Sequence, residues 1–286
     1  MWILYAFAST FFAGITAILA KIGIKKVDSN VATAVRTVIV LIFSWLMAFI
    51  VGSVGTISDI SFKSLIFLIL SGLATGGSWL CYFKALQMGN VNKVTPIDKS
   101  STILTILLAS IFLGEGLSAI KIVCLIAIGY GTFLMIDIKK NTESKDNGKG
   151  WIFYAVLSAV FASLTSILGK IGISGIESNL GTAIRTAVVL IMAWIIVFVT
   201  KKQGELRKIE RKSMLFICLS GITTGLSWLC YYKGLQDGQA SIVIPIDKLS
   251  IVLTIAFSYI FLKEKPAKKS LFGLILIVAG TLLLLI

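Results

Sequence analysis

Two copies of the stretch Pro-Ile-Asp-Lys constrain this chain more than any other feature of its sequence. The copies occupy positions 96–99 and 245–248, which lie 149 positions apart. The stretch Ser-Trp-Leu-Cys-Tyr precedes each copy, at 78–82 and 227–231, with the same interval. The chain is therefore one unit duplicated, and any fold that suits the first half must also suit the second.

Identical residues recur at this interval along nearly the whole chain. Examples are Tyr5 and Tyr154, Lys21 and Lys170, Arg36 and Arg185, Trp45 and Trp194, Thr75 and Thr224, Lys84 and Lys233, and Gly131 and Gly280. We therefore expect two repeats, residues 1–138 and 151–286, joined by a linker at 139–150. The linker contains asparagine, aspartate and glycine, which are typical of flexible loops.

The composition indicates that a lipid bilayer surrounds most of the chain. Hydrophobic residues make up 57% of the 286 positions and charged residues only 14%, against roughly 25% charged residues in soluble proteins. The mean hydropathy of +0.97 leads to the same conclusion. No soluble core accommodates so much apolar sequence, so the bilayer is the expected solvent and the first expected partner.

The apolar sequence divides into ten runs, each close to the roughly 20 residues that a helix needs to cross a bilayer. The runs are 2–22, 30–52, 63–86, 94–113, 118–138, 151–171, 179–200, 213–235, 243–262 and 268–286. Each half holds five of them, and an odd number of spans reverses the orientation of the second half. The predicted fold class is therefore an all-α membrane protein with ten transmembrane helices in two inverted five-helix repeats.

The net charge of +14 would usually suggest binding to nucleic acid. Here the basic residues fall in short loops between apolar runs, so we expect no nucleic-acid partner. The most basic loops follow spans 1, 3, 7 and 9, for example at 201–212. Because basic loops stay in the cytoplasm, we expect a multi-pass protein of the bacterial or archaeal cell (inner) membrane, with both termini outside.

Several kinds of chemistry lack the residues that they require. The chain has no histidine, which removes the commonest general base and metal ligand. Its four cysteines, Cys81, Cys124, Cys218 and Cys230, lie in apolar runs without the spacing of a metal site. We find no nucleophile–base pair and no phosphate-binding loop. The sequence predicts that the protein is not an enzyme and uses no metal or other cofactor.

The pattern of spans resembles the drug/metabolite transporter superfamily, EamA type, over the whole chain. Its marks are the two five-span repeats and the sequence Leu-Gly-Glu at 113–115, where span 4 ends; the second copy reads Leu-Lys-Glu at 262–264. The resemblance implies transport of small metabolites, often outward. Small multidrug-resistance relatives bind cations through a glutamate in span 1, and residues 1–20 contain no acid. The sequence therefore disfavours proton-coupled export of cationic drugs.

Ten residues inside the spans are candidates for substrate binding or gating. They are Arg36, Arg185, Asp98, Lys99, Asp247, Lys248, Trp79, Tyr82, Trp228 and Tyr231. A charge inside a bilayer is costly and is usually retained for function. Structural roles are open for each kind: basic side chains can snorkel, an aspartate after proline can favour the first turn of a helix, and aromatic residues can form an interfacial belt.

Other paired residues have a simpler interpretation. Lys21, Lys170, Lys84 and Lys233 stand at span ends, where we expect them to snorkel toward the membrane surface. The Gly-xxx-Gly pairs at 72–76 and 221–225 predict close packing between helices.

The embedded charge is mostly basic, which favours an anionic or zwitterionic substrate over a cation. We expect a secondary transporter, working as an exporter, for a small organic metabolite such as an amino acid or organic acid. Alternating access between the inverted repeats would use 98–99 and 247–248 as gates on opposite sides of the membrane. Alternatives are a flippase for a lipid-linked anion and a non-transporting scaffold. Coupling to a proton or to substrate antiport, and the oligomeric state, stay open.

Overall fold

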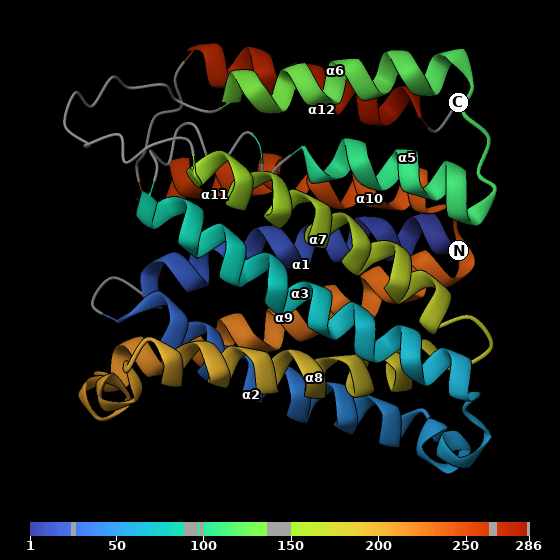
Figure 1. The fold of residues 1–286 in the computed structure, drawn as a ribbon. Helices are drawn as coiled ribbons and strands as arrows, with labels where there is room; N and C mark the ends of the chain where they lie inside the picture. Colours follow the sequence, from blue (N-terminus) through green and yellow to red (C-terminus); the bar gives the residue numbers. More distant parts are fainter. Residues whose placement is uncertain (24–26, 89–96, 98–99, 136–149, 263–267, 285–286) are drawn as a thin grey trace.

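The structure is a computed structural model that describes residues 1–23, 27–88, 97, 100–135, 150–262 and 268–284. No strand occurs in this part of the chain, which is a bundle of helices (Figure 1). The first half contains α1 (Trp2–Gly23), α2 (Ser29–Ile50), α3 (Phe62–Met88), α5 (Ser101–Leu113) and α6 (Ala119–Met135). The second half contains α7 (Gly150–Gly172), α8 (Ser178–Val199), α9 (Arg211–Asp237), α10 (Ala240–Lys248), α11 (Ser250–Leu262) and α12 (Lys268–Leu283).

Seven segments are long and apolar enough to cross a membrane by length and composition, and one of them runs through α10 into α11. Three shorter apolar helices, Ser101–Leu113, Ala119–Leu134 and Leu271–Leu283, fall in the remaining predicted spans. The predicted fold class, an all-helical membrane protein of ten spans in two repeats, is therefore confirmed.

Span 9 differs from the prediction because it is two helices rather than one continuous run at 243–262. α10 contains Pro245 and ends at Lys248, and α11 begins at Ser250. Proline has no backbone N–H and weakens a helix at its position, which explains the break. Asp247 lies in the last turn of α10, so its interpretation as a first-turn residue is wrong. Its repeat partner Asp98 and the adjacent Lys99 lie outside the described residues.

The two ends of the bundle differ in what they carry. Figure 1 shows the N-terminus, the C-terminus and the 3-10 helix η2 (Ser53–Asp59) at one end. The 3-10 helix η3 (Gln203–Lys208), within the basic loop at 201–212, lies at the opposite end. We call this opposite end the η3 end. An even number of spans requires that the two termini share one end, as they do here.

The two halves interlock instead of forming separate bundles. α1 packs against α9, and α3 packs against α7, so these two pairs are equivalent under the repeat. α2 packs against α8, and α6 packs against α12, each helix with its own repeat partner. Any cavity in the middle of the molecule is therefore lined by both halves, as expected where inverted repeats meet.

The Gly-xxx-Gly pairs lie where helices from opposite halves approach closely. A Cβ atom on Gly72 would lie 2.6 Å from the Cβ of Val188 on α8. A Cβ atom on Gly221 would lie 2.8 Å from the Cβ of Ile39 on α2. Only glycine fits at these two repeat-equivalent contacts, so the predicted close packing is confirmed.

Candidate functional site

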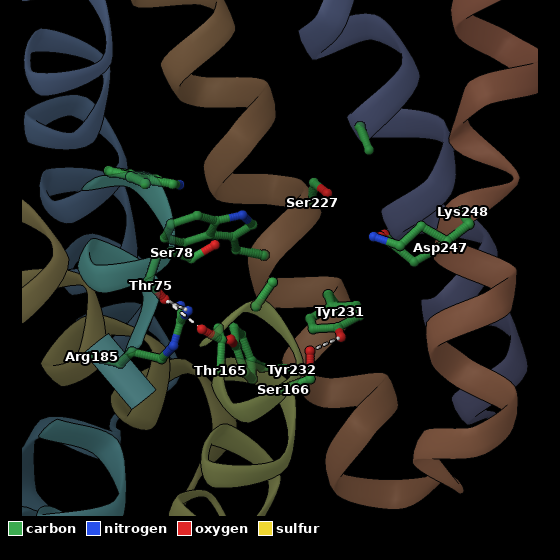
Figure 2. A pocket seen from close by; sticks show the side chains of 14 residues that line it. Thr75, Ser78, Thr165, Ser166, Arg185, Ser227, Tyr231, Tyr232, Asp247 and Lys248 are labelled. Carbon is green, nitrogen blue, oxygen red and sulfur yellow. Dashed lines mark hydrogen bonds between the residues drawn. The ribbon is translucent and has the colours of Figure 1, made fainter. Parts of the chain in front are cut away.

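A cavity of about 350 Å³ lies between the halves, among α1, α3, α7, α8, α9 and α10 (Figure 2). Its polar lining consists of hydroxyl and charged side chains: Thr75, Ser78, Thr165, Ser166, Ser227, Tyr231, Tyr232, Arg185, Asp247 and Lys248. Trp79 and Trp228 complete its aromatic wall. A polar cavity with charged groups, enclosed by apolar spans, is the strongest candidate for a binding site in this molecule.

Arg185 is the most deeply buried charged group of this cavity, with only 2% of its surface exposed. Its Nε donates a hydrogen bond to the hydroxyl of Ser71 at 2.9 Å, and its Nη2 donates to the hydroxyl of Thr75 at 2.7 Å. Both acceptors belong to α3 of the other half. The remaining nitrogen, Nη1, is buried and has no hydrogen-bond partner in the part of the chain that the structure describes.

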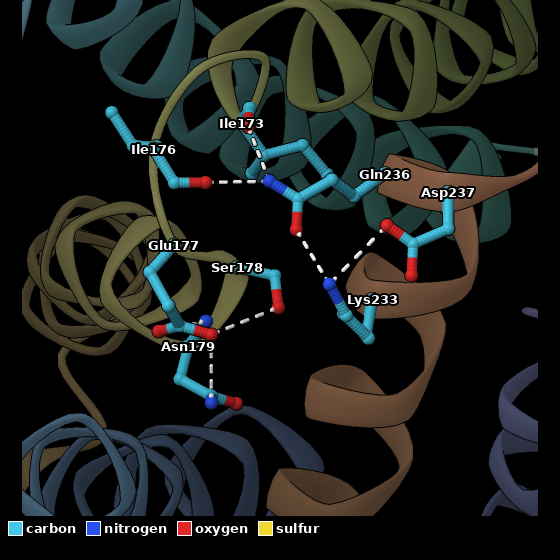
Figure 3. A network of polar contacts seen from close by, with 8 residues as sticks. All are labelled: Ile173, Ile176, Glu177, Ser178, Asn179, Lys233, Gln236 and Asp237. Carbon is cyan, nitrogen blue, oxygen red and sulfur yellow. Dashed lines mark hydrogen bonds and ion pairs between the residues drawn. The ribbon is translucent and has the colours of Figure 1, made fainter. Parts of the chain in front are cut away.

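Contacts at the start of α8 fix the position from which Arg185 extends. Gln236 on α9 donates through Nε2 to the backbone carbonyls of Ile173 and Ile176 in the turn before α8 (Figure 3). The carboxylate of Glu177 then accepts two backbone N–H groups of the first turn of α8, at 2.9 and 3.1 Å. An acid at this position satisfies unpaired N–H groups and faces the positive end of the helix. These contacts therefore hold the N-terminal end of α8, the helix that carries Arg185.

Aromatic rings provide most of the remaining surroundings of the guanidinium. Its Cζ lies 4.7 Å from the ring centroid of Tyr232 and 5.1 Å from that of Trp228. Such cation–π contacts favour a cation without neutralising its charge. Among the described residues no acidic side chain forms an ion pair with Arg185. The cavity is therefore lined by a buried cation that has no acidic partner among the described residues.

Asp247 provides the acidic group of the cavity, and Figure 2 shows it on the side opposite Arg185. Its Oδ1 accepts a hydrogen bond of 2.8 Å from the hydroxyl of Ser9 on α1. The Ser9 hydroxyl also lies 3.2 Å from that of Ser227 on α9. Thr10 donates to the backbone carbonyl of Ile246 at 2.8 Å, which satisfies a carbonyl near the break between α10 and α11. These contacts tie the broken helix to the other half of the protein.

The repeat is not symmetric at this site. Ser158 and Ser78 reproduce the contact of Ser9 with Ser227, with hydroxyl oxygens 3.3 Å apart. Arg36, the repeat partner of Arg185, does not line the cavity. It forms no hydrogen bond or ion pair with another residue that the structure describes. Of two arginines that the sequence could not distinguish, the structure places one in the cavity.

Six of the ten candidate residues line the cavity: Trp79, Arg185, Trp228, Tyr231, Asp247 and Lys248. Tyr82 does not, and it packs instead near Ala85 and Trp151. Asp98 and Lys99 lie outside the described residues.

The sequence interpretation missed Ser9, Ser71, Thr75 and Tyr232, although these residues position the two charged groups or contact them. Ser78 and Ser227 stand at the start of the duplicated Ser-Trp-Leu-Cys-Tyr stretch, which was a usable signal. The others gave little signal, because hydroxyls in helices commonly bond to their own backbone.

Over the described residues, no group of three or more histidine, cysteine, aspartate or glutamate side chains could hold a metal ion.

Comparison with known proteins assigns the family. The sequence pattern of the EamA-like transporter family matches residues 1–137 and 149–286. The chain belongs to this family. The two matched stretches fall on the two halves of the internal duplication, so each half is one EamA unit of an integral, multi-pass membrane protein.

Relatives of this EamA chain include proteins named as transporters. An "uncharacterized transporter in cobO 3'region" of Sinorhizobium sp is 43% identical over 136 residues, which are 48% of this chain and 96% of that protein. An "S-adenosylmethionine uptake transporter" of Rickettsia bellii is 27% identical over 220 residues, 76% of this chain and 71% of that protein. A solved crystal structure of another protein superposes with a TM-score of 0.79 at 15% identity, covering 98% of this chain and 95% of that one, which supports the fold alone.

The Leu-Gly-Glu sequence at the end of span 4, one mark of the EamA resemblance, connects several helices at the end of the bundle opposite η3. The Glu115 carboxylate accepts the backbone N–H groups of Ala240 and Ser241 at 2.6 and 2.8 Å, which caps the start of α10. Lys170 at the end of α7 donates to the same carboxylate at 3.1 Å and to the carbonyl of Gly238. The contacts join α5, α7, α9 and α10 at one point.

The snorkelling prediction is wrong for Lys170, because a buried carboxylate lies within its reach and provides a stronger partner than the membrane surface. Lys233 is also paired, with Asp237 at 3.2 Å and with Gln236 at 3.3 Å (Figure 3). The Lys84 side chain is exposed, as snorkelling would require. The side chain of Lys21 lies outside the described part of the structure.

Proposed function

We propose that this EamA protein is a secondary transporter of a small anionic or zwitterionic organic metabolite, such as an amino acid or organic acid. The observation that carries the proposal is that Arg185 lines the cavity while its buried Nη1 has no hydrogen-bond partner among the described residues. A buried charge without a counter-ion is costly, so the site gains stability when a bound anion provides one. Arginine suits a carboxylate because its planar donors bind both oxygens at once.

The opposite wall supports a zwitterion. Asp247 uses Oδ1 to accept the Ser9 hydroxyl, and its charge remains available to a ligand ammonium group. A ligand with a carboxylate near Arg185 and an ammonium near Asp247 would span the cavity shown in Figure 2. The relative named for S-adenosylmethionine transport adds weight, because that molecule carries an α-amino carboxylate.

The cavity volume favours a small metabolite over a lipid-linked anion. About 350 Å³ lies at the lower end of typical ligand cavities, which are roughly 300–1,000 Å³. A scaffold would have no use for a polar cavity between its halves. Alternating access requires such a site near the middle of the protein, where the two repeats meet.

A thermal-shift screen on purified protein tests the proposal. Amino acids, mono- and dicarboxylic acids, and quaternary ammonium ions as cationic controls would be added separately. A ligand that binds only the folded state stabilises it by about 2.7 kcal/mol at a concentration of 100 times its Kd. We expect stabilisation by a carboxylate-bearing compound. Stabilisation by the cationic controls alone would contradict an anion site at Arg185.

We also propose that the η3 end faces the cytoplasm, which places both termini outside. Its support is the basic loop at 201–212, because basic loops are retained in the cytoplasm. A cysteine placed at Gly204 in a cysteine-free chain should resist an impermeant thiol reagent in intact cells, whereas one placed at the C-terminus should react. The reverse pattern would invert the assigned orientation without changing the number of spans.

A further inference from the structure

A second cavity of about 210 Å³ adjoins the central one. It lies among α1, α5, α6, α10, α11 and α12, and its walls include Ala17, Thr102, Thr132, Lys248, Ser250 and Thr254. Ala13 and Lys248 line both cavities, so these two side chains stand between the two spaces. We call this boundary between the site of Arg185 and the second cavity the neck.

The second cavity is displaced toward the η3 end. Thr132 lies in the last turn of α6, and Ser250 and Thr254 belong to α11, on the η3 side of the break after α10. Arg185 lies in the part of α8 nearer the opposite end, because α8 begins there (Figure 1). The second cavity therefore lies on the η3 side of Arg185.

Its hydroxyl groups are arranged to accept hydrogen bonds. Thr132 donates its proton to the carbonyl of Ile128 at 2.7 Å, and Thr254 donates to that of Ser250 at 2.9 Å. Their lone pairs are left as acceptors, while Lys248 supplies a cationic donor. Such walls can solvate both the ammonium and the carboxylate of a zwitterion. At about 30 Å³ per water, the space has room for several waters or for part of a small metabolite.

The internal repeat argues against a packing defect. Three hydroxyl residues of the second cavity have hydroxyl residues as repeat partners: Thr132 pairs with Thr281, Ser250 with Ser101, and Thr254 with Thr105. In the other half two of these groups are sealed, whereas Ser101 is partly exposed. Thr281 is 0% exposed and its hydroxyl has no partner among the described residues, and Thr105 is 2% exposed. Two of the three polar positions thus line an open space in one half and are buried in the other, as alternating access between inverted repeats requires.

From these observations we propose that the second cavity is a chamber on the substrate path between the Arg185 site and the η3 end, with Lys248 selecting anionic groups at its neck. The proposal rests on the proposed transport function. In the opposite conformation the chamber closes, and the repeat-equivalent space around Thr105 and Thr281 opens toward the other end.

Cysteine accessibility tests the chamber without a known substrate. In a chain with its four native cysteines replaced, Thr254→Cys reports on the chamber. Thr105→Cys is the matched control in the other half, and Ile260→Cys reports on the outer face of α11, where Ile260 is 62% exposed. The probes are the anionic 2-sulfonatoethyl and the cationic 2-(trimethylammonio)ethyl methanethiosulfonates, applied to the η3 face of membrane vesicles.

We expect the anionic reagent to modify Thr254→Cys on the order of tenfold faster than either control cysteine, because a charged reagent gathers in a polar path of opposite charge. Lys248→Gln should remove the preference for the anionic over the cationic reagent at Thr254→Cys, an effect that a merely structural lysine would not produce. Equal rates at Thr254→Cys and Thr105→Cys, or at Thr254→Cys and Ile260→Cys, would overturn the chamber. An unchanged reagent preference in Lys248→Gln would overturn the role of the neck.

Failure of this proposal and failure of the proposed function give different results, because the modification needs no metabolite. A reactive Thr254→Cys in a protein that no carboxylate stabilises would leave the chamber and reject the proposed substrate class. A thermal shift with carboxylates in a protein whose Thr254→Cys does not react would reject the chamber and leave the proposed substrate class. If Lys248→Gln does not fold, the comparison of Thr254→Cys with Thr105→Cys decides the matter in the chain that retains Lys248.

Discussion

Replacing Arg185 by glutamine should weaken binding of a carboxylate ligand on the order of 100-fold or more, since removing one partner of a buried ion pair costs about 3–5 kcal/mol. Glutamine keeps a donor near Ser71 and Thr75 but loses the charge and the free Nη1. The measurement is the thermal shift of the purified variant against ligand concentration. Without ligand, Arg185→Gln should be as stable as the parent chain or more so, because the substitution removes a buried cation for which the described residues provide no counter-ion.

Arg36→Gln is the matched control for this substitution. It makes the same chemical change at the repeat-equivalent position, on a helix of the same length, outside the cavity wall. We expect it to bind ligand within a few-fold of the parent chain, the ordinary scale of an indirect effect. Equal loss of binding in both variants would mean that the arginines support the fold or the cycle symmetrically, and would remove Arg185 as the specific anion site.

Replacing Glu115 by glutamine should destabilise the protein more than any other single acid-to-amide change among the described residues. The Glu115 carboxylate is buried. It pairs with Lys170 at the end of α7 and accepts the N–H groups at the start of α10, where four helices meet. Loss of its charge leaves the Lys170 ammonium, which is 19% exposed, without its counter-ion. Breaking a buried pair costs about 3–5 kcal/mol, with partial exposure of the lysine reducing this value. The measurement is the midpoint of thermal unfolding in detergent.

Glu205→Gln provides the comparison, because Glu205 pairs with Lys208 at 3.2 Å, against 3.1 Å for Glu115 with Lys170, but on the surface, with the lysine side chain 72% exposed. A surface pair contributes little, so this variant should unfold at nearly the same temperature as the parent. The double variant Glu115→Gln with Lys170→Met should recover part of the loss, since it leaves no unpaired charge. Similar midpoints for Glu115→Gln and Glu205→Gln would show that the contacts at the end of α5 do not hold the helices together.

The same carboxylate gives the stability a dependence on pH. Burial raises the pKa of Glu115, but its hydrogen bonds with Ser241 and Ala240 and the charge of Lys170 outweigh burial, so the pKa lies below its ordinary value. A carboxyl whose pKa falls on folding stabilises the protein above its unfolded pKa of about 4.3, and this contribution disappears as pH falls through the folded pKa. Glu115→Gln should therefore lose less stability on acidification than the parent chain does.

The sequence by itself determined the membrane environment, the ten spans and the inverted relation of the two halves. These follow from the length of the apolar runs and from the odd number of spans per repeat, which are properties of the chain that need no long-range contact. The Gly-xxx-Gly pairs at 72–76 and 221–225 likewise predicted close packing, because a residue without a side chain lets two helices approach closely wherever they meet.

Only the tertiary structure decided which of the duplicated residues form the site. Arg36 and Arg185 have nearly the same local sequence, and the repeat also gives Arg36 a matching serine and threonine in the other half, Ser220 and Thr224. Of the two arginines, only Arg185 lines the cavity, and it donates hydrogen bonds to Ser71 and Thr75. The ion pair of Lys170 with Glu115 also joins residues far apart in the chain. The described conformation treats the two copies differently, as the proposed alternating access between inverted repeats requires. The sequence contains both copies of each residue, and only the packing in the described conformation decides which copy lines the cavity.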